Sequence, residues 1–84
     1  MSRLECIILS ILISEEAVNS MSAMSVYEIA DRIHHSYRAD SIYRKIVELI
    51  KKNCVKIGCK DGKANTYYIT EEGKASLEET KRAG

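Results

Sequence analysis

The sequence predicts a small α+β domain, mostly α, with three helices, a two-stranded β-hairpin and a C-terminal helix. Apolar residues recur at helical spacing through the N-terminal half of the chain, which predicts the helices. An alternating segment that is interrupted by Asp61-Gly62 predicts the hairpin. A chain of 84 residues has the length of one domain, so residues 1–84 are expected to fold as a single unit.

The first helix is predicted over about residues 3–13. Its apolar residues form one stripe and a second stripe beside it: Leu4, Ile7, Ile8, Ile11 and Leu12, then Cys6, Leu9 and Ile13. A helix that is apolar on most sides is central in its domain or shared with another subunit. Because the core of so short a chain is small, we expect a homodimer through the first and last helices. The polar residues 14–23 are expected to form a loop.

The second helix is predicted over about residues 26–34. Ser25 and Glu28 have the spacing of a capping box, in which Ser25 is the N-cap and Glu28 is the third helical residue. The inward stripe of this helix consists of Val26, Ile29, Ala30 and Ile33. A short turn at residues 36–40 then leads to the third helix.

The third helix is predicted over about residues 41–52, with Asp40 or Ser41 as its N-cap and Asn53 as a left-handed stop. Its buried stripe consists of Ile42, Ile46, Leu49 and Ile50, with Val47 beside it. Its exposed face carries Ser41, Arg44, Lys45, Glu48, Lys51 and Lys52. This face is therefore basic.

The hairpin is predicted from strands over residues 54–60 and 65–69, joined at Asp61-Gly62. On the first strand Val55, Ile57 and Cys59 share a face, and on the second Tyr67 and Ile69 do. Thr70 is expected to cap the last helix, over about residues 71–81, where two glutamates lie near the positive N-terminal end.

Charge is distributed unevenly along the chain, although the net charge is only +1. Residues 34–68 contain eight basic and three acidic residues, a net charge of +5, and the rest contains five basic and nine acidic residues, a net charge of −4. A basic segment between acidic flanks indicates an anionic partner, nucleic acid first, although a solvated face rich in lysine would give the same balance.

Two short helices joined by a tight turn form a helix-turn-helix, and a basic hairpin directly after it forms a wing. The sequence therefore predicts a winged helix-turn-helix that binds double-stranded DNA. The recognition helix of about residues 41–52 would enter the major groove, and the wing of about residues 54–69 would contact the backbone and minor groove. The candidate contacts are Arg38, Ser41, Tyr43, Arg44, Lys45, Lys60, Lys63 and Asn65. Ser41 could instead be a cap, Tyr43 could pack against the second helix, and the lysines could serve solubility alone.

Three stretches of the chain, YEIADRI, SIYRKIVELIKKNCVKI and YYITEEGKASLEE, resemble the PadR-type winged-helix transcriptional regulators and, more distantly, the MarR type. The resemblance covers roughly residues 4–79, and its most specific parts are SIY at 41–43 and the Tyr-x-Ile-Thr-Glu-x-Gly-Lys segment at 67–74. It implies transcriptional regulation, and specifically repression by occlusion of a promoter.

Two other functions fit the same fold. Residues 15–23 are longer and more polar than the tight turn expected of the PadR type, which leaves open a plasmid or phage partition protein that binds a centromere, similar to TubR. A winged helix can also act as a protein-interaction module without DNA contact. No small-molecule effector can be named from the sequence.

The cysteine and histidine residues do not predict a metal site. The three cysteines are an odd number and fit no disulfide framework, so a reduced, cytoplasmic chain is expected. Cys54 and Cys59 are not the close pair typical of zinc ligands, and the adjacent His34 and His35 point in different directions, although a metal or redox sensor would use such residues. We predict no cofactor, no membrane span and, because no catalytic constellation occurs, no enzymatic activity.

Overall fold

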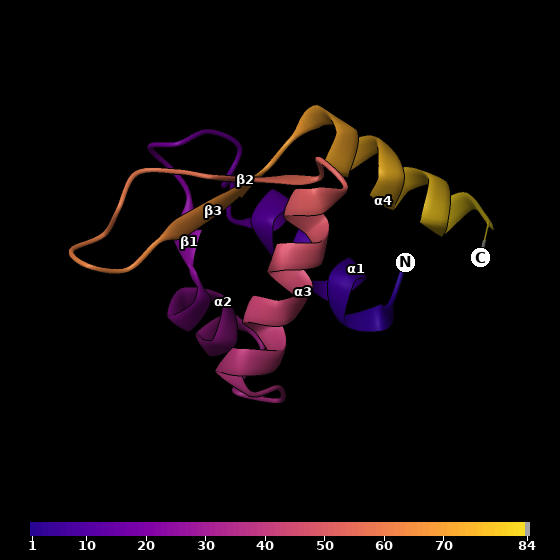
Figure 1. The fold of residues 1–84 in the computed structure, drawn as a ribbon. Coiled ribbons are helices and arrows are strands. Elements are labelled where there is room, and N and C mark those ends of the chain that lie inside the picture. Colours follow the sequence, from indigo (N-terminus) through magenta and orange to yellow (C-terminus); the bar gives the residue numbers. More distant parts are fainter. Residues whose placement is uncertain (84) are drawn as a thin grey trace.

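The computed structural model describes residues 1–83. Its elements follow in the order α1 (Arg3–Ser14), β1 (Met24–Ser25), α2 (Val26–Arg32), α3 (Ala39–Lys51), β2 (Val55–Ile57), β3 (Thr66–Ile69) and α4 (Glu71–Ala83). The helices gather around α1, and the β2–β3 hairpin extends away from them (Figure 1). We call this hairpin, residues 55–69, the wing.

The apolar helix α1 lies at the centre of the core, as its sequence predicts. Ile8, Leu9 and Leu12 are fully buried. The neighbouring α3, α4 and β3 contribute Ile42, Ile46, Leu49, Leu77 and Ile69 to the same core. The recognition helix predicted from sequence is therefore held in place by α1 together with α2.

The sheet has three strands, so the predicted two-stranded sheet is wrong by one strand. Met24 lies opposite Tyr67 and Ser25 lies opposite Thr66 in an antiparallel pairing of β1 with β3, and β2 pairs with the other side of β3. A strand of two residues is too short to produce an alternating pattern of polar and apolar residues. That is why no sequence signal marks β1.

Ser25 joins the sheet to α2, because it ends the strand and caps the helix. Its Oγ accepts a hydrogen bond from the backbone N–H of Glu28 (3.2 Å), and Oε1 of Glu28 accepts one from the N–H of Ser25 (3.0 Å). This reciprocal pair is the predicted capping box. The start of α2 is thus fixed to a strand that pairs with the wing.

The helix α2 ends at Arg32, two residues earlier than the prediction. His34 and His35 have φ angles of 53° and 56°, in the left-handed region, so the right-handed helix cannot continue through them. Because α3 also begins two residues early, the turn between the helices keeps its expected length and is shifted to residues 33–38.

The helix α3 begins at Ala39, two residues before the predicted start. Its N-cap is Arg38, whose side chain makes no capping hydrogen bond, and Asp40 and Ser41 lie in the first turn. The predicted cap at one of these two residues is therefore wrong. At the other end, Asn53 has a φ angle of 62°, which confirms the left-handed stop.

The strand β2 is shorter than predicted and ends at Ile57. Val55 is buried, whereas Ile57 is 55% exposed and Cys59 is exposed as well. The three residues were expected to share one face of the strand. Only Val55 reaches the core, because the wing extends past the helices from there onward (Figure 1).

A buried carboxylate ties α1 to the end of α3. Glu5 is 2% exposed; its Oε1 accepts a hydrogen bond from the N–H of Ser2 (2.9 Å), and its Oε2 lies 3.0 Å from Nζ of Lys52. Burial raises the pKa of Glu5, but the hydrogen bonds from Ser2 and Lys52 outweigh burial and hold the pKa below its ordinary value. Lys52, expected on the exposed face of the recognition helix, instead helps to hold that helix against α1.

The start of α4 packs closely against the segment after α3. Oγ1 of Thr70 accepts a hydrogen bond from the N–H of Gly73 (3.0 Å), which confirms the predicted cap, and donates one to the carbonyl oxygen of Asn53 (2.6 Å). A Cβ at Gly73 would overlap the carbonyl oxygen of Cys54 and the side chain of Ile69. Glycine is therefore required for this approach.

We expect Gly73→Ala to lower the free energy of unfolding by about 1–3 kcal/mol, because the added methyl group overpacks a backbone contact. Inside an ordinary helix the same change stabilises by about 1 kcal/mol, so the sign of the effect is informative. Urea unfolding measures it. Glu78→Ala, at an exposed position later in the same helix, is the control and should change the free energy little. A stabilised Gly73→Ala variant would contradict the close packing.

We also expect the Glu5 carboxylate to make stability depend on pH in acid. Because its pKa is lower in the folded than in the unfolded chain, its contribution is present above the ordinary glutamate pKa and is lost as pH falls through the folded value. Urea unfolding from about pH 3 to about pH 7 tests this on the protein and on Glu5→Gln. The difference in unfolding free energy between them should shrink toward acid pH; a constant difference would refute the assignment.

Candidate nucleic-acid interface

The outward face of α3 is opposite its buried stripe and is centred on two cations. The side chain of Arg44 is 75% exposed, and Lys51, two helical turns later, is exposed on the same side. Nη2 of Arg44 lies 3.5 Å from Oδ2 of Asp40, one turn earlier. This contact is solvent-exposed and therefore weak, so it leaves the guanidinium free to engage another anion.

Arg38 stands directly before α3 and has an 89% exposed side chain. Its Nε lies 3.7 Å from Oδ1 of Asp40, the carboxylate that also contacts Arg44. Two guanidinium groups thus flank one carboxylate, and the start of α3 keeps a net positive charge.

Ser41 and Lys45 lie at the edge of this face rather than at its centre. Both are partly buried, and they line a hollow together with residues at the start of α1. Nζ of Lys45 lies 3.4 Å from Oε2 of Glu48, and only 33% of the lysine side chain is exposed. The basic face is therefore rotated toward Arg44 and Lys51, compared with the face expected from sequence.

The wing tip carries the other candidate residues, Lys60, Lys63 and Asn65, which are all exposed. Two backbone hydrogen bonds between Asp61 and Ala64 (2.9 and 3.0 Å) close the turn, so its central residues are Gly62 and Lys63. Gly62 has a φ angle of 63°, as the first central residue of a tight hairpin turn requires. The turn thus presents Lys63 at the extreme end of the wing.

The segment 14–23, expected to be a simple loop, braces the base of the wing. The N–H of Cys59 donates a hydrogen bond to the carbonyl oxygen of Ser20 (3.0 Å). The N–H of Ile69 donates one to the carbonyl oxygen of Ala17 (2.9 Å). At Gly58 a Cβ would overlap the side chain of Ala23. The wing is therefore supported from this segment as well as by β1.

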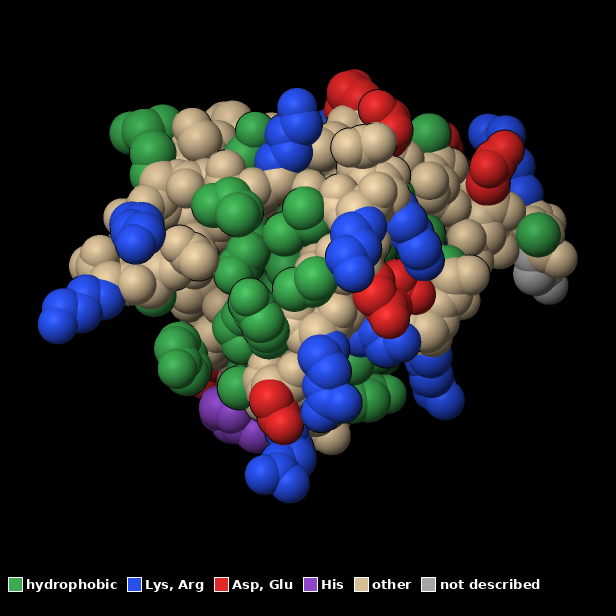
Figure 2. All heavy atoms as spheres, viewed as in Figure 1, with side chains coloured by type: hydrophobic (Ala, Val, Ile, Leu, Met, Phe, Trp, Pro, Cys, Tyr) green, Lys and Arg blue, Asp and Glu red, His purple; other side chains and the backbone are tan. Residues whose placement is uncertain are grey.

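One face of the molecule combines the wing and α3. Figure 2 shows Lys and Arg side chains in two groups on this face, one over the wing and one over α3. Hydrophobic side chains occupy the area between the two groups. The exposed large apolar residues of these elements and of α2 are Tyr27, Tyr43 and Ile57.

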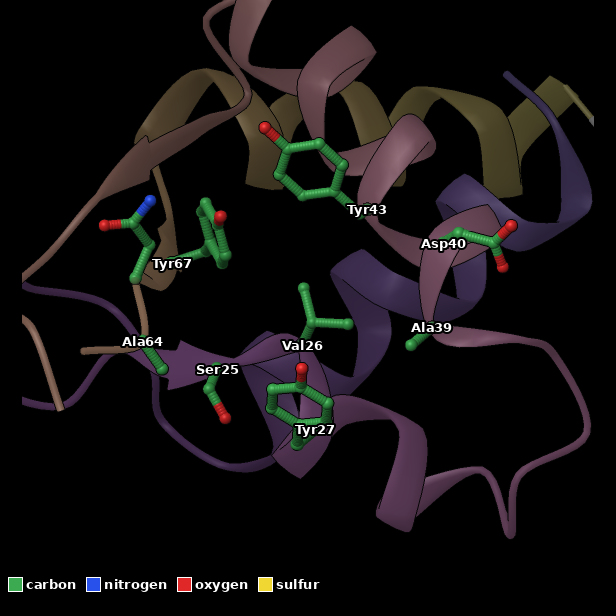
Figure 3. A pocket seen from close by; sticks show the side chains of 9 residues that line it. Ser25, Val26, Tyr27, Ala39, Asp40, Tyr43, Ala64 and Tyr67 are labelled. Atoms are coloured by element: carbon green, nitrogen blue, oxygen red, sulfur yellow. The ribbon is translucent and has the colours of Figure 1, made fainter. Parts of the chain in front are cut away.

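A hollow of about 460 Å³ separates the wing from the starts of α2 and α3 (Figure 3). Its apolar lining is formed by Val26, Tyr27, Tyr43, Ala64 and Tyr67. Asn65 and Asp40 also line it, and Asp40 is the one charged residue among the lining residues. The middle of this face is thus nearly uncharged, in contrast to its two sides.

Tyr67 forms a neutral part of this lining. Burial raises the pKa of Tyr67, the nearby Tyr43 raises it further, and a hydrogen bond from Asn65 opposes the change without cancelling it. The phenol therefore stays protonated at neutral pH.

Tyr27 is a further candidate residue that the sequence pattern did not single out. It is 71% exposed and lies across the hollow from Tyr43 (Figure 3). A signal was available, because Tyr27 falls outside the inward stripe of α2, and an aromatic residue outside the buried stripe of a short helix is exposed.

The cysteines and histidines do not come together in the part of the chain that the structure describes. Among residues 1–83 no three His, Cys, Asp or Glu side chains are grouped as metal ligands would be. Cys54 is buried, with its Sγ 3.7 Å from Oγ of Ser76, and Cys59 is exposed. Over the same residues each helix is too short or too polar to cross a bilayer.

Solved structures with the same arrangement are winged-helix proteins. TubR from Bacillus megaterium pBM400 aligns with a TM-score of 0.80 at 21% identity, over 95% of this chain and 86% of that chain. A PadR family transcription regulator from Clostridium difficile R20291 aligns with a TM-score of 0.75 at 22% identity, over 98% of this chain and 86% of that chain. The chain has the winged-helix fold. The predicted fold class is thus confirmed, with the third strand added.

The PcaV transcriptional regulator from Streptomyces coelicolor aligns with a TM-score of 0.76 at 14% identity, over 93% of this chain but only 51% of its own. No protein-family model matches the chain, and no curated protein sequence matches it. At these identities the likeness establishes the fold, and the function has to be argued from the residues.

Proposed function

We propose that the protein binds double-stranded DNA and regulates transcription, with α3 in the major groove and the wing on the backbone and adjacent minor groove. The observation that supports this is the presence of two groups of basic side chains on one face (Figure 2). Phosphates border both edges of each groove, so separated groups of cations suit a duplex. The winged-helix regulators with the same fold support the same conclusion.

The exposed side chains divide into base-reading and phosphate-binding roles in this proposal. Arg44 lies in the middle of the outward face of α3, and arginine pairs bidentately with the major-groove edge of guanine. Arg38 and Lys51 at the ends of α3, and Lys60 and Lys63 on the wing, bind phosphates. Ser41 and Lys45, at the edge of the face, contact the backbone beside the groove.

Repression is the regulatory outcome that we propose. A domain that fills the major groove with α3 and covers the adjacent backbone with the wing excludes other proteins from the same stretch of DNA. When that stretch is a promoter, the result is repression by occlusion.

Plasmid or phage partition is a second candidate function, favoured by the similarity in both fold and length to TubR. A partition protein would bind an array of repeated sites, whereas a repressor would protect one site at a promoter. DNA footprinting on the region around the gene distinguishes the two by the number of protected sites.

The DNA-binding proposal predicts affinity that falls steeply with salt concentration. The affinity for a labelled random-sequence duplex can be measured by fluorescence anisotropy at several salt concentrations. The logarithm of the affinity should fall linearly with the logarithm of the salt concentration. Lys51→Ala and Lys63→Ala should each weaken binding about tenfold and reduce the salt slope by about 1, because each removes a phosphate contact. Lys45→Ala should have a smaller effect than Lys51→Ala, because Lys45 is partly buried at the edge of the face.

The matched control is Lys81→Ala, which removes an exposed cation from α4, far from the wing. It should leave affinity and slope nearly unchanged. If the folded protein binds no duplex even at low salt, the DNA proposal fails, and a winged-helix protein-interaction module becomes the better explanation.

We also propose a homodimer that forms through α1. The face of α1 opposite the core carries only one charged residue and consists of Arg3, Ile7, Ser10, Ile13 and Ser14. Ile13 is 39% exposed. The last helix, expected to share the interface, contributes less, since Leu77 is buried in the core of its own domain and Ala75 has charged neighbours.

Sedimentation equilibrium should therefore give a dimer mass, and the double variant Ile7→Glu/Ile13→Glu should give a monomer mass, because two carboxylates would be buried in the interface. The exposed pair Glu78→Gln/Glu79→Gln on α4 is the control and should remain dimeric. A monomer mass for the unmodified protein at high concentration would rule out this interface.

A further inference from the structure

The hollow between the wing and α3 is nearly uncharged although it lies in the middle of a basic face. Its lining is mainly aromatic and aliphatic, and exposed cations occupy both of its sides (Figures 2 and 3). If only phosphate charge were to be matched, cations would be expected across the whole face. The hollow therefore matches a part of the partner that is apolar.

Two tyrosines stand at the rim of the hollow on opposite sides. Tyr43 extends from α3 toward the wing, Tyr27 rises from α2, and Val26 lies between them (Figure 3). Tyr43 is 50% exposed and Tyr27 is 71% exposed. Exposed phenols at the rim of an apolar hollow offer hydroxyl donors above an apolar floor.

The proposed DNA-binding mode determines what crosses the hollow. When α3 occupies the major groove and the wing lies at the adjacent minor groove, the sugar–phosphate strand between these grooves passes between the two elements. That strand alternates apolar deoxyribose rings with phosphates. The hollow is bounded by the same two elements, so it faces this strand.

We propose that the hollow seats one deoxyribose of this strand, while the hydroxyls of Tyr27 and Tyr43 donate hydrogen bonds to the phosphates on either side. This inference rests on the proposed DNA-binding function and adds an uncharged contact to its cationic ones. Val26 and Tyr67 form the apolar floor under the sugar. Asp40, which also lines the hollow, lies 3.7 Å from the guanidinium group of Arg38 and 3.5 Å from that of Arg44, so the local net charge stays positive.

An uncharged contact has a different signature from a cationic one. A lysine or arginine that binds phosphate releases a counterion, so its removal lowers both the affinity and the salt slope. A tyrosine hydroxyl that binds phosphate releases none. Removing the hydroxyl therefore lowers affinity at every salt concentration and leaves the slope unchanged.

Tyr27→Phe and Tyr43→Phe, alone and together, test the proposal by anisotropy on a labelled random-sequence duplex at four salt concentrations. Each single variant should weaken binding about tenfold to a hundredfold, as loss of a hydrogen bond to a charged group does, with an unchanged salt slope. The affinity of the double variant should fall by roughly the product of the two single-variant factors. Urea unfolding of each variant establishes that the fold is intact.

Tyr68→Phe is the matched control, because Tyr68 points to the opposite face of β3 from Tyr67 and does not line the hollow. This variant should bind as the unmodified protein does. Unchanged affinity in both Tyr27→Phe and Tyr43→Phe would overturn the seat for the sugar–phosphate strand while leaving the DNA-binding proposal in place. A salt slope reduced by about 1 would also overturn it. An unmodified protein that binds no duplex would overturn both proposals.

Discussion

The burial of α1 is the constraint on which the rest of the structure depends. Its apolar stripe contacts α3, α4 and β3, and so fixes the position of α3 relative to the sheet. The buried carboxylate of Glu5 adds an ion pair with Lys52 at the C-terminal end of α3. A slip of α1 along α3 would leave this carboxylate without its partner, which is costly in a buried position. The packing therefore favours one arrangement of the two helices.

Ser25 transmits that arrangement to the wing. Because the same residue ends β1 and caps α2, a movement of α2 relative to the sheet would break either the capping hydrogen bond or the strand pairing. The segment 14–23 supports the wing from its other side. The result is a face whose two sides are basic and whose middle is apolar. Cations attract DNA over a distance and are screened by salt, whereas apolar and hydroxyl contacts act only at close range and orient the duplex.

Local signals in the sequence were sufficient for most of the architecture. The helical spacing of apolar residues determined α1 and α3, the Ser25 and Glu28 pair determined the start of α2, and Asp61-Gly62 determined the turn region of the wing. Thr70 likewise marked the start of α4. Each of these features depends on residues that are close together in the chain, so propensity and spacing are enough to find them.

What only the tertiary structure decided involves residues far apart in the chain. The strand β1 exists because it pairs with β3, and Glu5 is buried because Lys52, 47 residues later, reaches it. The rotation of α3 in its packing against α1 decided that Lys45 lies at the edge of the basic face. Tyr27 became a candidate because residues of the wing, α2 and α3 line one hollow. By itself, then, the sequence determined the elements and the class of fold. The shape and charge of the functional face came from long-range packing, which leaves no local pattern in the chain.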